Sequence, residues 1–265
     1  LEAFLNRHNP GGCIQKGEFC TSAKGRSVEW LQVGGEGEDA RYRIALLCRH
    51  HACETMASFV LEGILEAAIS DTPHGRWLRE NTKILAIPFM DKDGVEEGDQ
   101  GKNRAPHDHN RDYGEESIYP EVRAVRAFLP KWMAEDGLSI GLDLHCPWIR
   151  GGKGGPADNE QVFFVGIPDQ EVWARLQVFA AVLESEHSGP VVYSPQHDIP
   201  YGVGWTTSTG NCAQWLGSQT GEPAAGTLEI PYANAGGTIV TPETARRFGK
   251  DLARAMQVYL ANKEG

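Results

Sequence analysis

The sequence predicts an α/β fold, in which a central mixed, largely parallel sheet carries helices on both faces. Short apolar runs, typical of buried strands, alternate along the chain with longer segments whose apolar residues recur at helical spacing. This alternation is typical of a parallel sheet covered by helices. The sequence contains no recognisable linker, repeat or low-complexity segment, so we expect residues 1–265 to form a single domain.

The first half of the chain contains predicted strands, a helix and a long polar segment. Residues 27–33 have the alternation of a half-buried strand, and residues 44–48 form a continuous apolar run, as in a strand buried on both faces. Residues 55–69 have the periodicity of an amphipathic helix, and residues 82–89 form the next strand. Residues 91–113 have no periodicity. A polar segment of this length is usually functional or disordered, and we expect this one to line a cleft.

The other predicted elements complete the alternation of strands and helices. They are a short helix at 1–5, a helix at 120–132, strands at 138–144 and 161–166, a helix at 169–186, a strand at 224–230, and a last helix that begins at Thr241-Pro242. Thr241 is the expected N-cap of that helix, with Pro242 at its first position.

The composition is that of an ordinary globular protein, with 40% hydrophobic and 23% charged residues. The formal net charge of −11 argues against nucleic acid as a partner and against nonspecific binding to anionic membranes. No apolar run approaches the ~20 residues needed to span a bilayer. The six cysteines lack the paired spacing of a structural zinc site, and no signal peptide is visible after Leu1, so we expect a cytoplasmic location. A disulfide between Cys13 and Cys20 is the alternative for an exported protein.

The predicted strand at 44–48 leads into His51-Ala52-Cys53-Glu54. A His-x-x-Glu sequence at the start of a helix places an imidazole beside a carboxylate, and both are ligands of catalytic zinc. The pair also suits an ordinary helix terminus, with a carboxylate near the positive end of the helix dipole. Sites in open α/β sheets lie at the carboxyl ends of strands, which favours the metal site.

Two later strands supply candidate partners for this pair. The strand at 138–144 runs directly into His145, which could be a third ligand. The strand at 224–230 contains Glu229 within an apolar run. Glu229 is either a solvent-facing strand residue or a general base whose pKa is raised by partial desolvation.

The polar segment contains candidate substrate-binding groups. Asn110 and Arg111 could hold a substrate carboxylate, because an arginine can bind a carboxylate with two hydrogen bonds. Lys102 and Arg104 are candidate cations for a developing oxyanion. The alternative is a solvated basic loop.

Taken in order, these motifs resemble those of the zinc metallocarboxypeptidase family, the carboxypeptidase A-like enzymes. The matching motifs are His51-x-x-Glu54, Asp108-x-Asn110-Arg111, His145 and Glu229, an "S-x-x-G-R" opening at residues 22–26, and a "D-G-[VY]" turn at Asp93-Gly94-Val95. They extend over nearly the whole chain. The resemblance implies the α/β fold of that family and one zinc ion per chain.

The resemblance also implies a role for each matching residue. The zinc ligands would be His51, Glu54 and His145, with a water in the open position, and Glu229 would move the proton of that water to the leaving amine. The other implied roles are Asp108 orienting the first zinc histidine, Asn110 and Arg111 binding the C-terminal carboxylate of the substrate, and Arg104, or Lys102 in its place, polarising the scissile carbonyl.

Three positions depart from the family pattern. Cys53 stands where relatives often have arginine, and residues 205–210 contain no clear match to the mobile tyrosine that precedes the catalytic glutamate. Ala213 stands at the usual specificity position, so we expect no strong selection for a charged terminal residue.

The resulting hypothesis is a zinc-dependent carboxypeptidase that hydrolyses the C-terminal peptide bond of peptides. One alternative is a zinc deacylase of N-acyl amino acids, similar to aspartoacylase or succinylglutamate desuccinylase, which uses a similar ligand set. The "S-x-x-G-R" opening and the segment before Glu229 favour the carboxypeptidase. Another alternative is a metal-free binding module, which would not need Glu54, His145 and Glu229 together.

Overall fold

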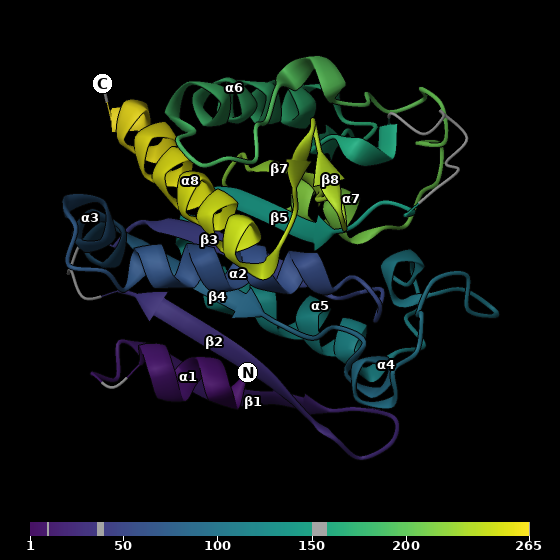
Figure 1. Ribbon diagram of the computed structural model, residues 1–265. Coiled ribbons are helices and arrows are strands. Elements are labelled where there is room, and N and C mark those ends of the chain that lie inside the picture. The colour runs from purple at the N-terminus through teal and green to yellow at the C-terminus, as the bar shows by residue number, and fades with distance from the viewer. Residues whose placement is uncertain (10, 36–39, 150–157, 265) are drawn as a thin grey trace.

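The computed structural model describes residues 1–9, 11–35, 40–149 and 158–264 (Figure 1). Its helices are α1 (Glu2–His8), α2 (Thr55–Ala68), α3 (Pro73–Asn81), α4 (Lys92–Glu97), α5 (Pro120–Met133), α6 (Gln170–Glu186), α7 (Cys212–Gly217) and α8 (Pro242–Ala261). Its strands are β1 (Ile14–Thr21), β2 (Ser27–Gly34), β3 (Tyr42–Cys48), β4 (Thr82–Ile87), β5 (Ile140–His145), β6 (Phe163–Val165), β7 (Ala224–Glu229), β8 (Asn234–Ala235) and β9 (Thr238–Ile239).

The main sheet has seven strands in the order β1-β2-β4-β3-β5-β7-β6. Strands β4, β3, β5 and β7 are parallel, whereas β1, β2 and β6 join in antiparallel pairs at the two edges. The predicted mixed, largely parallel sheet is therefore confirmed. Parallel strands place their carboxyl ends at one edge, which is where a site is expected in an open α/β sheet.

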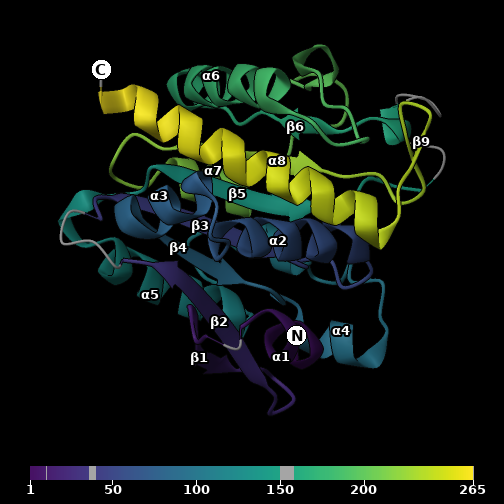
Figure 2. The same cartoon turned by 60° about the vertical axis from the view of Figure 1, so that its left-hand side comes forward.

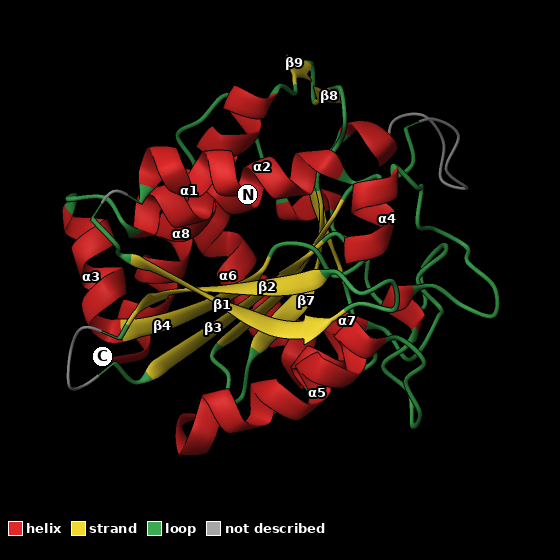
Figure 3. Cartoon of the chain, turned by 90° about the horizontal axis from the view of Figure 1, so that it is seen from below, coloured by secondary structure: helices red, strands yellow, loops and turns green. Residues whose placement is uncertain are grey.

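Helices cover both faces of the sheet, as predicted. Residues Ile44, Leu46 and Cys48 of β3 pack into the apolar cluster that contains α2, α6 and α8. The intervening Ala45 and Leu47 pack into a second cluster with α5 and α7. Figure 2 shows α8 lying across the sheet beside α2, and Figure 3 shows α5 and α7 on the opposite side. Burial on both faces explains why this strand is an uninterrupted apolar run.

The sequence analysis did not predict β1 or α3, and it predicted a turn within α4. Strand β1 is at the edge of the sheet and buries only Ile14 fully, so it lacks a clear period-two pattern. Helix α3 is only nine residues long, although Thr72 caps it and Pro73 opens it. The expected turn at residues 93–95 is instead part of α4, which Asp91 caps by accepting from the Gly94 amide at 2.9 Å. Short capped helices of this kind have little periodicity.

The "S-x-x-G-R" opening has a structural role in this fold. It forms the turn between β1 and β2, where Ser22 Oγ donates to Asp93 Oδ1 at 2.8 Å. Arg26 Nη1 donates to the same oxygen at 2.6 Å, and the backbone amide of Lys24 donates to Asp93 Oδ2 at 3.0 Å. These bonds tie the turn to α4, the first element of the polar segment, and so fix one end of that segment.

We expect Asp93→Asn to lower the free energy of unfolding by about 1.5–3 kcal/mol at pH 7, because it removes the charged acceptor of several hydrogen bonds. Burial opposes ionisation of Asp93, but the bonds from Arg26 and Ser22 outweigh it and lower the pKa of this carboxyl. This contribution is therefore present above about pH 4, the unfolded-state value, and is lost as the pH falls through the lower folded-state pKa. Denaturant unfolding of the unmodified protein and of Asp93→Asn, from pH 7 to pH 3, measures the difference in the free energy of unfolding.

The matched control is Asp71→Asn, since Asp71 is an exposed aspartate. Its free energy of unfolding should equal that of the unmodified protein at every pH. A difference between Asp93→Asn and the unmodified protein that stays constant from pH 7 to pH 3 would contradict the assigned role.

The cysteines are free thiols in the structure. Cys13, which is exposed, and Cys20, which is half-buried, are both unpaired, and the alternative disulfide between them is not formed. Cys48 and Cys146 are buried beneath the strand ends. None of the helices in the described residues combines the length and apolar character needed to cross a membrane.

Candidate functional site

A pocket of about 360 Å³ opens at the carboxyl ends of β3, β5 and β7. The register of the sheet creates it, because His145 at the end of β5 lies directly opposite Glu229 at the end of β7. The turn after β3 brings His51 and Glu54 to the same edge. The lining also includes Lys102, Asn103, Asp108, Asn110, Arg111, Trp148, Phe163, Val165, Tyr201, Trp205, Thr206, Ser208, Asn211 and Thr227.

The turn from β3 into α2 presents His51 and Glu54. It starts at Arg49, whose φ of 62° lies in the left-handed region, and Arg49 Nε donates to the carbonyl oxygen of Ala52 at 3.0 Å. Gly101 packs against this turn, because a Cβ atom at that position would lie 2.4 Å from the Ala52 nitrogen. Glycine is therefore required where the polar segment crosses the turn.

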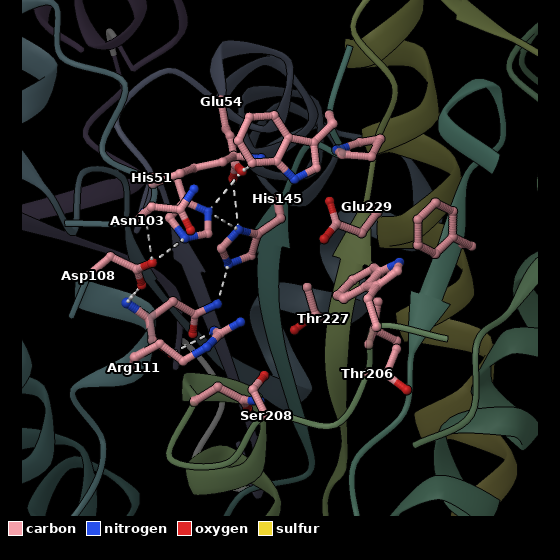
Figure 4. Close-up of a pocket in the computed structure, with 18 of the residues that line it drawn as sticks. His51, Glu54, Asn103, Asp108, Arg111, His145, Thr206, Ser208, Thr227 and Glu229 are labelled. Atoms are coloured by element: carbon pink, nitrogen blue, oxygen red, sulfur yellow. Dashed lines mark hydrogen bonds and ion pairs between the residues drawn. The ribbon is translucent and has the colours of Figure 1, made fainter. Parts of the chain in front are cut away.

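The side chains of His51, Glu54 and His145 converge at one point (Figure 4). His51 Nδ1 lies 2.9 Å from Glu54 Oε1, His145 Nδ1 lies 2.7 Å from Glu54 Oε2, and the two Nδ1 atoms are 3.2 Å apart. Ligand atoms at about 2.0–2.1 Å from a tetrahedral zinc ion are separated by about 3.3 Å. Two nitrogens and a carboxylate this close together fit a metal ion, and the sequence had grouped these same three residues.

Asp108 lies on the other side of the His51 ring. Its Oδ2 is 3.5 Å from His51 Nε2, and its Oδ1 accepts from the backbone amide of Asn110 at 3.0 Å. Burial opposes ionisation of Asp108, but the contact with His51 outweighs it and lowers the pKa of this carboxyl to about 2. Asp108 is thus an ionised acceptor for the Nε2 proton, which leaves Nδ1 free to face Glu54.

Glu229 faces the His51, Glu54 and His145 group from the opposite wall of the pocket (Figure 4). The side chain is buried, and Oε2 has no hydrogen-bond partner among the described residues. Burial raises the pKa of this carboxyl, and the nearby Glu54 raises it further. The solvent-facing alternative for Glu229 is therefore wrong. A buried carboxylate with an unpaired oxygen is suited to accept a proton from a molecule in the pocket.

The structure distinguishes between the two candidate cations, Arg104 and Lys102. Arg104 is not among the residues that line the pocket, and its Nη2 lies 2.6 Å from Asp91 Oδ2 and 3.1 Å from Asp99 Oδ2. Lys102 lines the pocket, where its Nζ lies 2.7 Å from Glu54 Oε1 and donates to the carbonyl oxygen of Cys146 at 2.9 Å. The geometry thus favours Lys102 over Arg104 as the cation of the site.

Asn110 and Arg111 reach the pocket from the polar segment, as expected. Asn110 is anchored by the Cys212 backbone amide, which donates to its Oδ1 at 3.0 Å. Arg111 Nη1 donates to the Asn110 carbonyl oxygen at 3.0 Å, and the rest of its guanidinium faces the pocket (Figure 4). Figure 4 also shows Arg111 on the same side of the pocket as Asp108.

The residue that was expected to set substrate specificity does not lie in the pocket. Ala213 is buried in the apolar cluster beneath α7 and does not line the pocket. Its neighbour Asn211 does, together with uncharged residues of the far wall, which are Phe163, Val165, Gly166, Tyr201, Trp205, Thr206, Ser208 and Thr227. Tyr201, which the sequence had not singled out, lines the pocket and donates from its hydroxyl to the Thr207 carbonyl oxygen at 3.2 Å.

Sequence reasoning assigned no role to Asp143 or to His50. Asp143 is fully buried in β5, two residues before His145, and its Oδ2 lies 2.7 Å from His145 Nε2. Its Oδ1 lies 2.7 Å from His50 Nδ1. Asp143 is a lone carboxylate in an apolar strand, which is the same signal that identified Glu229.

Comparisons with known proteins identify the family of this chain. The family model described as zinc carboxypeptidase matches residues 8–147, just over half of the chain. Cytosolic carboxypeptidase 2 of Danio rerio is 28% identical over 134 residues, which are 48% of this chain and 19% of that protein. The chain therefore spans less than a fifth of the length of this relative.

Solved structures share the fold. A metallo-carboxypeptidase from Burkholderia cenocepacia superposes with a TM-score of 0.78 at 19% identity, over 98% of this chain and 68% of that one. A proposed carboxypeptidase from Burkholderia mallei superposes with a TM-score of 0.80 at 18% identity, over 98% of this chain and 67% of that one. At this identity the superpositions establish the shared fold alone.

Proposed function

This chain belongs to the zinc carboxypeptidase family, and from that premise we propose that it is a zinc-dependent exopeptidase that hydrolyses the C-terminal peptide bond of peptides. One observation carries the proposal. The pocket holds two imidazole nitrogens and a carboxylate at one point and a buried carboxylate with an unpaired oxygen, that of Glu229, on the facing wall. A binding module would have no use for the second carboxylate.

We propose His51, Glu54 and His145 as the residues that hold one zinc ion. The donor set is supported by the separations of its atoms and by the carboxylate acceptors, Asp108 and Asp143, behind the two histidine rings. Zinc held there would polarise a carbonyl group and make a water molecule more acidic, which is the chemistry zinc supplies in hydrolases.

The other residues of the pocket would position the substrate and move protons. Glu229 would accept a proton from the attacking water and return it to the departing amine nitrogen, because its raised pKa makes both transfers accessible. Asn110 and Arg111 would bind the C-terminal carboxylate of the substrate. Lys102 would stabilise negative charge on the carbonyl oxygen. The uncharged far wall would receive an uncharged terminal side chain.

We also propose that residues 1–265 act as one catalytic domain, in a reducing compartment such as the cytoplasm. The single-domain proposal is supported by the pocket, which draws its residues from the turn after β3, the polar segment and the ends of β5 and β7. The compartment is supported by the free thiols.

The proposal is tested by offering zinc-loaded protein three compounds, each with the same uncharged terminal residue. They are a blocked dipeptide with a free carboxylate, the same dipeptide as its C-terminal amide, and the simple N-acyl amino acid. We expect release of free amino acid from the first compound and little from the other two. Preferential cleavage of the N-acyl amino acid would instead assign the chain to the deacylases.

Lys102→Ala should lower kcat about 100- to 1,000-fold, which is the usual cost of removing one group that stabilises an oxyanion. Arg104→Ala serves as the matched control, because its guanidinium is engaged by Asp91 and Asp99 outside the pocket. This control should affect thermal stability more than kcat. A larger loss of kcat in Arg104→Ala than in Lys102→Ala would restore Arg104 as the catalytic cation.

A further inference from the structure

A chain of buried polar side chains runs from His145 into the core of the protein. Asp143 accepts from both of its histidine neighbours, with Oδ2 at 2.7 Å from His145 Nε2 and Oδ1 at 2.7 Å from His50 Nδ1. His50 Nε2 lies 2.8 Å from the hydroxyl of Tyr113. All four side chains are buried, at 0–6% exposure. Polar groups are costly to bury in this number unless each has its partner, as here.

An ionised Asp143 directs the hydrogen bonds of both histidines toward its carboxylate, and the 3.1 Å contact between His145 Nε2 and Asn110 Nδ2 then joins two donors and is not a hydrogen bond. An ionised carboxylate can only accept, so His145 Nε2 and His50 Nδ1 must both carry protons. A neutral His50 then has a lone pair on Nε2, which accepts from the Tyr113 hydroxyl. When a neutral His145 carries its one proton on Nε2, the lone pair is on Nδ1, which is the atom that faces His51 and Glu54.

The same series of hydrogen-bonded side chains joins three parts of the site. Asp143 lies on β5, opposite Leu47 of β3, and reaches His50 in the turn that presents His51. The rings of His50 and His145 are nearly parallel, at an interplanar angle of 8° and a centroid separation of 5.8 Å. Tyr113 lies at the end of the polar segment, two residues after Arg111. The side chains therefore fix the two strand ends and the segment relative to one another.

We propose that Asp143, His50 and Tyr113 are positioning residues that set the affinity of the His51, Glu54 and His145 group for zinc. This inference rests on the proposed function. Asp143 holds His145 in the tautomer and orientation that a metal ligand requires, while His50 holds Asp143 and is itself held by Tyr113. Through the backbone, His50 also steadies the neighbouring His51.

A second metal site does not account for these residues. His50, Asp143 and Cys212 do offer donor atoms within 4.8 Å of one another. However, both nitrogens of His50 and both oxygens of Asp143 already have hydrogen-bond partners. A metal would have to displace these bonds, whereas the group at His51 lies open to the pocket.

The test measures the zinc dissociation constant of metal-free protein by competition with a chromophoric chelator, so it needs no enzyme activity. Asp143→Asn should raise the dissociation constant about 10- to 100-fold, the usual effect of removing a partner of a metal-binding histidine. Tyr113→Phe, which removes one hydroxyl at the far end of the chain, should raise it less. Thermal unfolding of the metal-free proteins is recorded separately. A positioning residue affects the zinc dissociation constant, whereas a purely structural residue affects the unfolding temperature alone.

Asp251→Asn is the matched control. Asp251 is also a buried carboxylate, but it accepts from Ser188 and Gly189, away from the pocket. The control should lower the unfolding temperature and leave zinc affinity unchanged. If Asp143→Asn and Tyr113→Phe behave like this control, the inference is wrong while the proposed function stands. If the unmodified protein itself binds no zinc, both are overturned.

Discussion

Replacement of Glu229 by glutamine should leave the protein folded and able to bind zinc, but should lower kcat at least about 100-fold. Glutamine has nearly the same shape and cannot accept a proton from water or return one to an amine. General acid–base groups contribute typically ~100- to 10,000-fold to turnover. Burial of Glu229, with one oxygen unpaired, is the structural reason for expecting the effect here. Steady-state kinetics on a blocked dipeptide, together with the zinc content of the variant, provide the measurement.

Glu222→Gln is the control for this experiment. Glu222 is an exposed carboxylate just before β7, at the opposite end of the strand from Glu229. It should have normal kcat. Turnover near normal in Glu229→Gln would show that another group acts as the base.

The second large effect is expected from His51→Ala, which should reduce bound zinc from one ion per chain to nearly none and abolish hydrolysis. The substitution removes one of two imidazole nitrogens that lie 3.2 Å apart. Two remaining ligands cannot complete the three-residue set that a catalytic zinc site requires. Atomic spectroscopy of dialysed protein measures the metal directly.

The neighbouring His50→Ala distinguishes a ligand from a residue that positions one. His50 contacts Asp143 and Tyr113 instead of the pocket, so this variant should bind zinc more weakly yet reach one ion per chain at saturating zinc. The opposite outcome, in which His50→Ala cannot be loaded and His51→Ala can, would mean that the wrong histidine has been assigned.

Much of the fold could be predicted because its central strands are buried on both faces. For this reason the apolar run of β3 clearly predicts a strand. The apolar runs of β5 and β7, which end at His145 and Glu229, do so as well. Edge strand β1 has one fully buried residue and was missed. Helices α3 and α4 are recognisable from their caps more than from their periodicity, since each has few turns in which a pattern can repeat.

The residues of the candidate site that lie at the ends of strands could be predicted from the sequence. His145 and Glu229 stand at the ends of parallel strands, and such ends always meet at one edge of the sheet. Lys102 and Arg104 lie in a segment without periodicity, so only the three-dimensional path of that segment separates the pocket-lining residue from its neighbour. Asp143 was overlooked although its position matches that of Glu229, because its partner His50, which in turn contacts Tyr113, is distant in the sequence.

The most direct test of the account is mass spectrometry of one peptide in two forms, with a free C-terminal carboxylate and with a C-terminal amide. Both are incubated with zinc-loaded protein, with chelator-treated protein and with Glu229→Gln. We expect the zinc-loaded protein alone to shorten the free-acid peptide by its last residue, because Arg111 and Asn110 would have a carboxylate to bind. Equal cleavage of the amide, cleavage at internal bonds, or no cleavage by the zinc-loaded protein would contradict the account.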